Sequence, residues 1–341
     1  MTAHVTVERI GPGATVQDLG RAGYIAQGLS RGGAADRLAI LEAAALLDQP
    51  PGPAIELPPV PCRLRVDTPT RVALTGAPRG ATAGDGSLAW HAVHGLAAGA
   101  TLEIGAGAGG YAYVTFGGGL ATPERLGARS AHLAAGLMAP LESGDRLPLD
   151  PDRGGRTDYR LTVADRFAGG TLRILPSTHT RLFGEDGLER FCATAFTRAP
   201  RGNRQGVRLD HDGAPFATEG QLTLLSEIAR PGDIQMTGEG TPYLLGPECQ
   251  TTGGYPRIAA VLPADLPRAV QAPPGATLRF RLVTREEALA DHVPEARQLR
   301  ALGARVERLT RDPREIRDLG SYQLISGVTA GRPGPVGEET E

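Results

Sequence analysis

Short apolar runs, separated by Gly and Pro, recur along most of the chain. They are Val5–Ile10, Arg71–Thr75, Ala100–Ile104, Tyr111–Phe116, Leu161–Ala164, Thr171–Leu175, Leu222–Ile228, Arg257–Leu262 and Thr277–Val283. The last run alternates apolar and charged positions, as a half-buried strand does. Runs of this length with turn signals between them predict a mostly β fold, built as barrels or sandwiches.

A weak internal repeat suggests two related domains. The segment Gly99–Ile104 is echoed by Gly275–Phe280, and each reads as a turn that feeds a strand. Two β domains would produce this echo, and so would chance in a chain rich in Gly and Ala. The charged stretch Asp150–Tyr159 is the predicted linker. We therefore expect β domains at residues 1–155 and 156–285.

Two segments carry helix signals. Asp36 is a candidate N-cap for a helix over Arg37–Leu47. Thr284-Arg285-Glu286-Glu287 reads as a capping box that opens a C-terminal helix, which Pro294 restarts or kinks. We expect this helical extension over residues 286–341.

The extension has an apolar stripe and a polar end. The stripe consists of Leu299, Leu302, Val306 and Leu309. It predicts packing on the parent domain, or else a surface for a partner. The tail from Gly331, rich in Pro, Gly and Glu, is predicted to be disordered.

The composition excludes several classes of function. The 341 residues include 47 Gly and 28 Pro, carry a net charge of −2, and show no basic run, so nucleic-acid binding has no electrostatic footprint. All 36 basic Lys+Arg residues are Arg. Without Lys there is no P-loop lysine, no Schiff base to pyridoxal phosphate and no covalent biotin on this chain.

The cysteines and the hydropathy of the chain predict the cellular compartment of the protein. The three cysteines, Cys62, Cys192 and Cys249, form no CxxC motif, which favours a reduced, cytoplasmic protein. The N-terminal residues lack the apolar core of a signal peptide, and no apolar run approaches the length of a membrane span.

The densest chemistry lies in Gln250-Thr251-Thr252-Gly253-Gly254-Tyr255-Pro256, which combines an amide, two hydroxyls and a Gly-Gly pair. Glycines allow positive φ and close approach to a ligand, so a binding loop is one interpretation. A tight hairpin corner is the other.

A second segment, Asn203–Leu209, contains the only Asn of the chain, close to Arg204 and Arg208. Such a residue suggests a site, although an Asn also commonly closes a turn through its own backbone.

Four other motifs match poorly. Gly28–Gly32 fits G-x-S-x-G, but a nucleophile elbow needs a strand before Ser30 and a helix after it. Gly105–Gly110 fits G-x-G-x-x-G, but a strand follows it where a dinucleotide fold needs a helix. His91 and His94 have metal-like spacing without a third ligand, so we predict no metal site. Asp210–Asp212, which includes His211, reads as a polar turn or a proton-transfer group.

Several segments together resemble one family. Thr15–Tyr24, Gly28–Asp36, Ala54–Glu56, Leu74–Ala77, Asn203–Leu209, Gln250–Pro256 and Ala264–Leu266 match its motifs in order. The family is that of the KipI antagonists (KipA), also called allophanate hydrolase subunit 2-like or biotin-dependent carboxyltransferase-like, and includes the C subunit of bacterial 5-oxoprolinase (PxpC). Gln205 stands where the family usually has Met, and Glu248 where it commonly has Asp.

The resemblance implies two cyclophilin-like β-barrel domains and membership of a complex. It implies two partners, a KipI-like B subunit and a lactam-utilisation (LamB/YcsF-like) A subunit. The implied reaction is the ATP-driven opening of 5-oxoproline to glutamate, with ATP and Mg²⁺ acting at the level of the complex.

The expected catalytic residues are Asn203, Arg204, Arg208 and Glu248. In this hypothesis the arginines stabilise a transferring phosphoryl group, and Glu248 acts as a base or magnesium ligand. The expected substrate-binding residues are Gln250, Thr251, Thr252, Gly253, Gly254, Tyr255, Asp18, Arg21 and Asp36. For Asp18, Arg21 and Asp36, a structural ion-pair network is an equal alternative.

Two rival functions stay open. Relatives within urea amidolyase transfer a carboxylate from biotin to urea, which here would require a separate biotin carrier. A KipI antagonist instead binds a kinase inhibitor without turnover.

Overall fold

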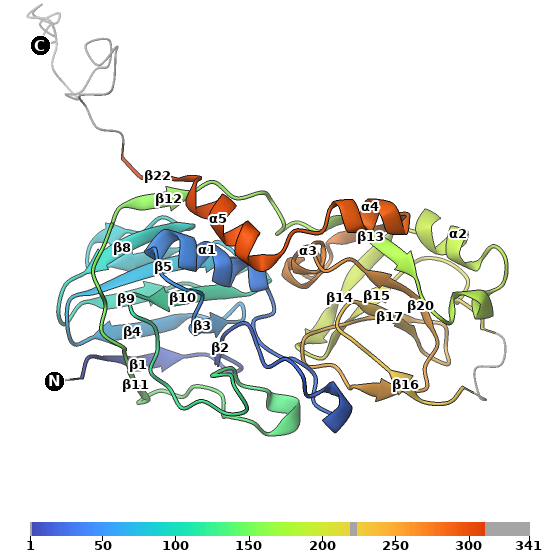
Figure 1. Ribbon diagram of the computed structural model, residues 1–341, viewed down its shortest axis with the longest axis horizontal. Helices are drawn as coiled ribbons and strands as arrows, with labels where there is room; N and C mark the ends of the chain where they lie inside the picture. Colours follow the sequence, from blue (N-terminus) through green and yellow to red (C-terminus); the bar gives the residue numbers. More distant parts are fainter. Residues whose placement is uncertain (1, 219–223, 311–341) are drawn as a thin grey trace, which may run out of the picture.

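The computed structural model describes residues 2–218 and 224–310. The chain forms two β domains that lie side by side, with the C-terminal extension running along one edge of both (Figure 1). The predicted mostly β class is confirmed. None of the helices in the described part of the chain is long and apolar enough to cross a membrane.

The first domain consists of two sheets around one core. One sheet has the order β11 (Arg146–Pro148), β1 (His4–Ile10), β4 (Cys62–Val66), β9 (Thr101–Ile104), β6 (Ala81–Ala83) and β7 (Gly86–Ser87). The other has the order β2 (Thr15–Gln17), β3 (Ala54–Leu57), β10 (Ala112–Phe116), β5 (Thr70–Gly76), β8 (Ala92–Leu96), β12 (Tyr159–Leu161) and β22 (Val306–Arg308). Buried Val7 and Leu64 of the first sheet belong to the same core as Leu74 and Val114 of the second.

The second domain is a closed barrel. Its strands follow the order β13 (Gly170–Pro176), β20 (Arg257–Val261), β17 (Asp233–Met236), β18 (Pro242–Leu245), β15 (Gly206–Asp210), β14 (Phe196–Asn203) and β21 (Thr277–Leu282). Strands β13 and β21 close the barrel as a parallel pair. Phe191 of helix α2 (Gly187–Ala193) packs in the core against Phe196 and Phe280. Helix α3 (Leu266–Gln271) lies beside β13.

Helix α1 spans Arg37–Leu47 as predicted. The Asp36 carboxylate accepts a hydrogen bond from the Ala39 amide and caps its first turn. The helix is buried on nearly every side, because β5 and β10 pack on it from one direction and the C-terminal extension from another. Short 3₁₀ turns occur at Ile25–Gln27, Leu133–Ala135 and Thr180–Phe183.

The predicted repeat corresponds to equivalent turns in both domains. Gly99 and Gly275 have φ of 77° and 83°, and β9 and β21 each begin two residues later. Only glycine adopts this left-handed conformation without strain. The turn-to-strand part of the repeat is therefore real.

The extension contains helices α4 (Arg285–Ala290) and α5 (Glu295–Gly303). The capping box between Thr284 and Glu287 is present. The predicted stripe is divided differently, because α5 ends at Gly303 and Val306 lies in strand β22. Leu299, Leu302 and Val306 still pack with the first domain, as one alternative predicted. The tail from Gly331 lies outside the described residues.

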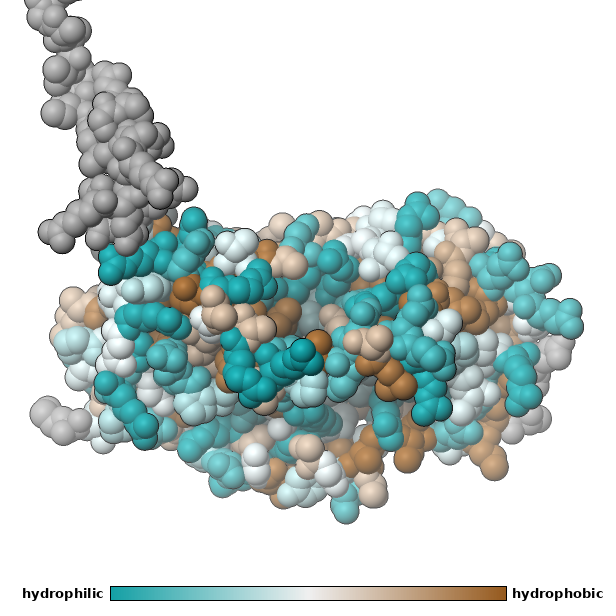
Figure 2. Space-filling model, turned by 45° about the horizontal axis from the view of Figure 1, so that its top comes forward, coloured by the Kyte–Doolittle hydropathy of each residue, from teal (hydrophilic) through white to brown (hydrophobic). Residues whose placement is uncertain are grey.

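The path between the domains is not a free linker. Asp152, within Asp150–Tyr159, pairs with Arg71 of β5 at 2.6 Å, and β12 then extends the first domain's sheet. The boundaries at residues 155 and 285 stay a prediction. The face that carries the extension is mostly polar, with small scattered apolar patches (Figure 2).

Candidate functional site

The Gln250–Pro256 segment is not a hairpin corner. It leaves the end of β18, and its strand β19 (Thr252–Gly253) pairs with β16 (Glu227–Ile228). Neither Gly253 nor Gly254 has a positive φ, so a positive φ does not explain why glycines occupy these two positions. Gly253 instead makes room, since a Cβ at this position would lie 3.2 Å from Nε2 of Gln235.

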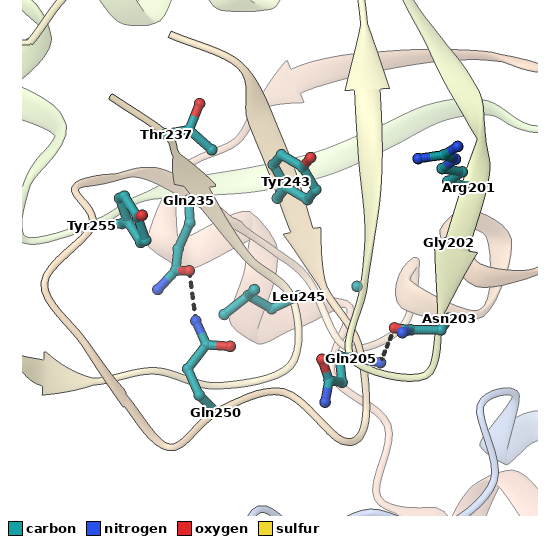
Figure 3. Close-up of a pocket in the computed structure, with 11 residues that line it drawn as sticks. Arg201, Gly202, Asn203, Gln205, Gln235, Thr237, Tyr243, Leu245, Gln250 and Tyr255 are labelled. Atoms are coloured by element: carbon teal, nitrogen blue, oxygen red, sulfur yellow. Dashed lines mark hydrogen bonds between the residues drawn. The ribbon is translucent and has the colours of Figure 1, made fainter. Parts of the chain in front are cut away.

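This segment covers one side of a pocket on the barrel wall (Figure 3). The pocket has a volume of about 450 Å³, within the range of small-molecule sites. Its lining comes from strands β14, β15, β17 and β18 and from the segment itself. The lining residues are Arg201, Gly202, Asn203, Gln205, Gly206, Gln235, Thr237, Tyr243, Leu245, Gln250 and Tyr255.

Side-chain amides dominate the chemistry of this pocket. The Gln250 amide nitrogen donates to Oε1 of Gln235 at 2.8 Å. Gln235 is only 5% exposed, and its own Nε2 has no hydrogen-bond partner. Exchanging O and N in both amides would make Gln235 the donor, leave its oxygen as the unpaired buried atom, and move the free NH₂ to the exposed Gln250. In the arrangement of the structure the unpaired buried atom is the Gln235 nitrogen, which is costly to bury, so the pocket holds a group that is ready to donate.

Arg201 is the cation of the pocket. Its side chain is exposed on β14, and no hydrogen bond or ion pair joins it to any described residue. No Asp or Glu is among the described residues that line the cavity. The pocket therefore presents hydrogen-bonding groups and a positive charge without an acidic group.

Asn203 closes a turn, which is one of the two alternatives that its sequence left open. Its Oδ1 accepts a hydrogen bond from the Gln205 amide at 2.8 Å, which closes the turn between β14 and β15. It also lines the pocket.

Arg204 points away from this pocket into the contact between the domains. Its Nε donates to Oε1 of Glu248 at 2.5 Å, and its two terminal nitrogens donate to Glu56 and to the Gly33 carbonyl. Arg204, Glu56 and Glu248 are 7%, 1% and 2% exposed. Although burial opposes the charge, the two carboxylates raise the pKa of Arg204. Each nitrogen of this guanidinium therefore already donates within the protein.

Glu56 continues the network into the first domain. Its Oε2 accepts hydrogen bonds from the Tyr113 hydroxyl at 2.7 Å and from the Ala35 amide at 2.8 Å. Burial raises the pKa of Tyr113 well above its ordinary value, and the Glu56 charge adds to the effect. Arg204 of the second domain therefore pairs with a carboxylate of the first domain that already accepts two other hydrogen bonds.

Asp36 belongs to a second buried network across the same contact. Its carboxylate accepts from Nε of Arg166 at 2.7 Å and from Nε2 of Gln271 at 2.8 Å. Arg166 also makes a bidentate pair with Glu42, with both distances at 2.8 Å. For Asp36, the structural alternative fits this geometry.

Asp18 and Arg21 organise loops of the first domain. Asp18 accepts from the amides of Gly20 at 2.8 Å and Arg129 at 2.7 Å. Arg21 donates to the Ser130 carbonyl at 2.5 Å, and its Nη1 is buried without a partner. Neither residue lines the pocket.

The remaining predicted residues are dispersed. Arg208 is half exposed and pairs with Asp210 at 2.6 Å on the barrel surface. Thr251 is buried and Thr252 exposed, and neither lines the pocket. The predicted catalytic set is therefore split among the pocket, the domain contact and the surface.

A near match to a catalytic triad is formed by Ser30, His132 and Glu248. The imidazole hydrogen of His132, however, lies on the nitrogen next to the serine. Ser30 Oγ lies 2.8 Å from Nε2 of His132, and Nδ1 lies 3.9 Å from Glu248. The Ala135 amide donates to Nδ1, so Nε2 carries the hydrogen and cannot accept the serine proton. All three side chains are buried, and Ser30 lies in a loop without an elbow.

The histidine motifs hold no metal set. Within the described ranges, no group of three or more His, Cys, Asp or Glu is placed to bind an ion. His91 is buried beside Phe167, and His94 hydrogen-bonds to the Ala89 carbonyl at 2.8 Å. His211 packs against Phe196 and Phe216.

Comparison with known proteins agrees with this architecture. A model of the carboxyltransferase domain, subdomain A and B, matches residues 27–282. The chain belongs to this carboxyltransferase domain family. It is 30% identical over 306 residues to the C subunit of 5-oxoprolinase from Escherichia coli (strain K12), covering 87% of this chain and 97% of that protein. The protein of the same name from Haemophilus influenzae is 31% identical over 281 residues, covering 81% and 90%.

Solved structures of other proteins share this fold. The crystal structure of TTHA0988 has a TM-score of 0.75 at 27% identity, over 82% of this chain and 56% of that one. The urea carboxylase of Kluyveromyces lactis has a TM-score of 0.74 at 23% identity, over 84% of this chain and 28% of that one. This chain thus spans only part of each of these larger proteins.

Sequence reasoning missed Arg201, Gln235 and Tyr243 in the pocket and Glu56 in the network. Arg201 is two residues from the Asn203 segment, so that motif gave a usable signal. Gln235 had none, because it sits in an ordinary short strand and reaches the site only through the pairing of β17 with β18.

Proposed function

We propose that this protein is the C-type component of an ATP-dependent 5-oxoprolinase complex, which converts 5-oxoproline to glutamate. Two relatives named as 5-oxoprolinase C subunits, aligned over most of the chain, support the proposal. The observation that carries it is the pocket, where amides and an unpaired arginine meet without any acidic group. Such a lining suits a small anion that also has an amide to hydrogen-bond.

In this proposal the chain binds and orients the substrate. The Gln235–Gln250 pair supplies amide hydrogen bonds, and Asn203 and Gln205 add polar groups at the rim. Orientation lowers the barrier because the reacting groups no longer have to find each other. No carboxylate or imidazole of the described lining is available to move a proton.

ATP and Mg²⁺ do not fit this pocket, and we derive no step through them on this chain. Mg²⁺ prefers carboxylate and phosphate oxygens, and the described lining has no carboxylate. Glu248, the predicted ligand, is occupied by Arg204 and by the Ala134 amide. We place nucleotide chemistry in the complex, with a KipI-like B subunit and a lactam-utilisation-like A subunit as cytoplasmic partners.

The decisive experiment mixes this chain with those two neighbours and measures ATP hydrolysis and glutamate. ATP turnover that depends on 5-oxoproline, and that disappears when this chain is omitted, is the expected result. A stable complex with no stimulated turnover would refute the proposal.

A carboxyltransferase acting on urea or a related amide is the second candidate, because the family description and the fold both point to carboxyl transfer. Carboxylation of urea by a separately added biotinylated carrier would support it. Binding to the KipI-like partner without turnover on any amide would instead support the antagonist function.

A further inference from the structure

The pocket has two distinct recognition elements on opposite sides. In the view of Figure 3, the Gln235–Gln250 pair lies on one side and Arg201 on the other, with Tyr243 and Leu245 between them. The amide pair comes from β17 and the loop after β18, whereas Arg201 comes from β14. A ligand that engages both must therefore carry two different polar groups, separated by an apolar middle.

The amide element is short of one acceptor. Gln235 is 5% exposed, and its free nitrogen is buried without a partner. A carbonyl oxygen supplies the acceptor that this amide nitrogen lacks. Gly253 leaves space beside this nitrogen, since a Cβ there would lie 3.2 Å from it.

The charged element is an exposed guanidinium. Two neighbouring arginines have carboxylate partners, namely Arg204 with Glu56 and Glu248 and Arg208 with Asp210, whereas Arg198 of β14 donates to the Ala199 carbonyl. Arg201 has none among the described residues. A guanidinium recognises a carboxylate through paired N–H groups.

We infer that the pocket selects a small cyclic amide that carries a carboxylate, with Gln235 donating to the ring carbonyl and Arg201 binding the carboxylate. This inference rests on the proposed function and assigns its substrate specificity to these two residues. A ring amide without the carboxylate satisfies only Gln235, and a ring carboxylate without the amide satisfies only Arg201.

The test compares three ligands by calorimetry on the full chain: 5-oxoproline, 2-pyrrolidinone and cyclopentanecarboxylate. We expect 5-oxoproline to bind at least about tenfold more tightly than either of the others, since each lacks one hydrogen-bonded group. Arg201→Met should weaken 5-oxoproline to the level of 2-pyrrolidinone and leave 2-pyrrolidinone unchanged. Gln235→Met should weaken 5-oxoproline and leave cyclopentanecarboxylate unchanged.

Arg279→Met is the matched control. Arg279 is exposed on β21 of the same barrel, outside the pocket lining, and this variant should bind like the wild type. Equal binding of all three ligands, or no loss in Arg201→Met and Gln235→Met, would overturn the inference.

A parallel assay separates this inference from the proposed function. The KM for 5-oxoproline is measured in the reconstituted complex with each variant. If the complex turns over 5-oxoproline and neither variant raises KM, the inference fails while the function stands. If the isolated chain discriminates among the ligands but the complex shows no turnover, the recognition stands and the function fails. If nothing binds to the isolated chain, a KM raised at least about tenfold by both variants is still required, and its absence overturns the inference.

Discussion

Replacing Arg204 by Met should destabilise the protein strongly, because Arg204 neutralises two carboxylates at the contact between the domains. Glu56 and Glu248 are 1% and 2% exposed, and Arg204 donates to both. Removing one partner of a buried ion pair leaves an uncompensated charge and costs about 3–5 kcal/mol. Since domains have about 5–15 kcal/mol of stability in total, we expect Arg204→Met to lose a large part of it.

The pH dependence of this loss tests its cause. Without the guanidinium, burial favours the protonated form of the two carboxyl groups in the folded variant, whereas Glu in the unfolded chain has a pKa of about 4.3. The folded variant then binds more protons than the unfolded chain, so its stability falls as pH rises. The deficit relative to wild type should therefore be greatest at neutral pH and shrink toward the unfolded pKa.

The assay is urea unfolding followed by circular dichroism at neutral and mildly acidic pH. Arg208→Met is the control, because it removes an arginine of the same motif from an exposed pair with Asp210 and should leave the midpoint nearly unchanged. A second variant adds Glu56→Gln and Glu248→Gln to Arg204→Met, and should recover part of the loss because no buried charge remains. Equal stability of Arg204→Met and wild type, or a deficit that grows on acidification, would refute the reasoning.

Three further changes test other buried groups. Burial lowers the pKa of His91 to about 4. The wild type should therefore lose up to about 3 kcal/mol of its free energy of unfolding as pH falls from about 6.5 to about 4. His91→Asn should lack this loss in unfolding titrations. Gln271→Leu removes bonds to Asp36 and to the Tyr111 backbone, and should cost about 2–4 kcal/mol by urea unfolding. Gly33→Ala should lower the thermal midpoint, because φ is +80° and the new Cβ would meet backbone at 2.6 Å; an unchanged midpoint would contradict the strain.

The sequence predicted the local elements well where one physical signal dominated. Asp36 and Thr284 cap helices as expected, because a side-chain oxygen can satisfy the free amides of a first turn whatever surrounds it. The apolar stripe that includes Val306 was predicted to be helical throughout, because apolar spacing alone does not indicate the residue at which a helix ends. Pairing of β22 with β12 decides that end, and such pairing joins residues 147 positions apart.

The candidate site was predictable only in part. The motifs marked Asn203 and Gln250, which line the pocket, and gave the same weight to Arg204 and Glu248, which do not line it. Sequence reasoning has no access to where a side chain points, and neighbouring residues in a strand or turn face opposite ways. Asn203 and Arg204 are such neighbours, with one in the pocket and the other between the domains.

Hydrogen-bond satisfaction separates these two kinds of polar residue. Each of the three guanidinium nitrogens of Arg204 already donates, to Glu248, to Glu56 and to a backbone carbonyl, so turning this group toward a ligand would first break buried bonds. Gln235 already carries the cost of an unpaired buried nitrogen, so a ligand carbonyl would recover free energy on binding. An unsatisfied buried donor lowers the stability of the fold. In a saturated network, by contrast, the hydrogen bonds within the protein offset the cost of burying the polar groups. For this reason we assign recognition to the amide pocket of the barrel and assign the ionic cluster around Arg204 to holding the two domains together.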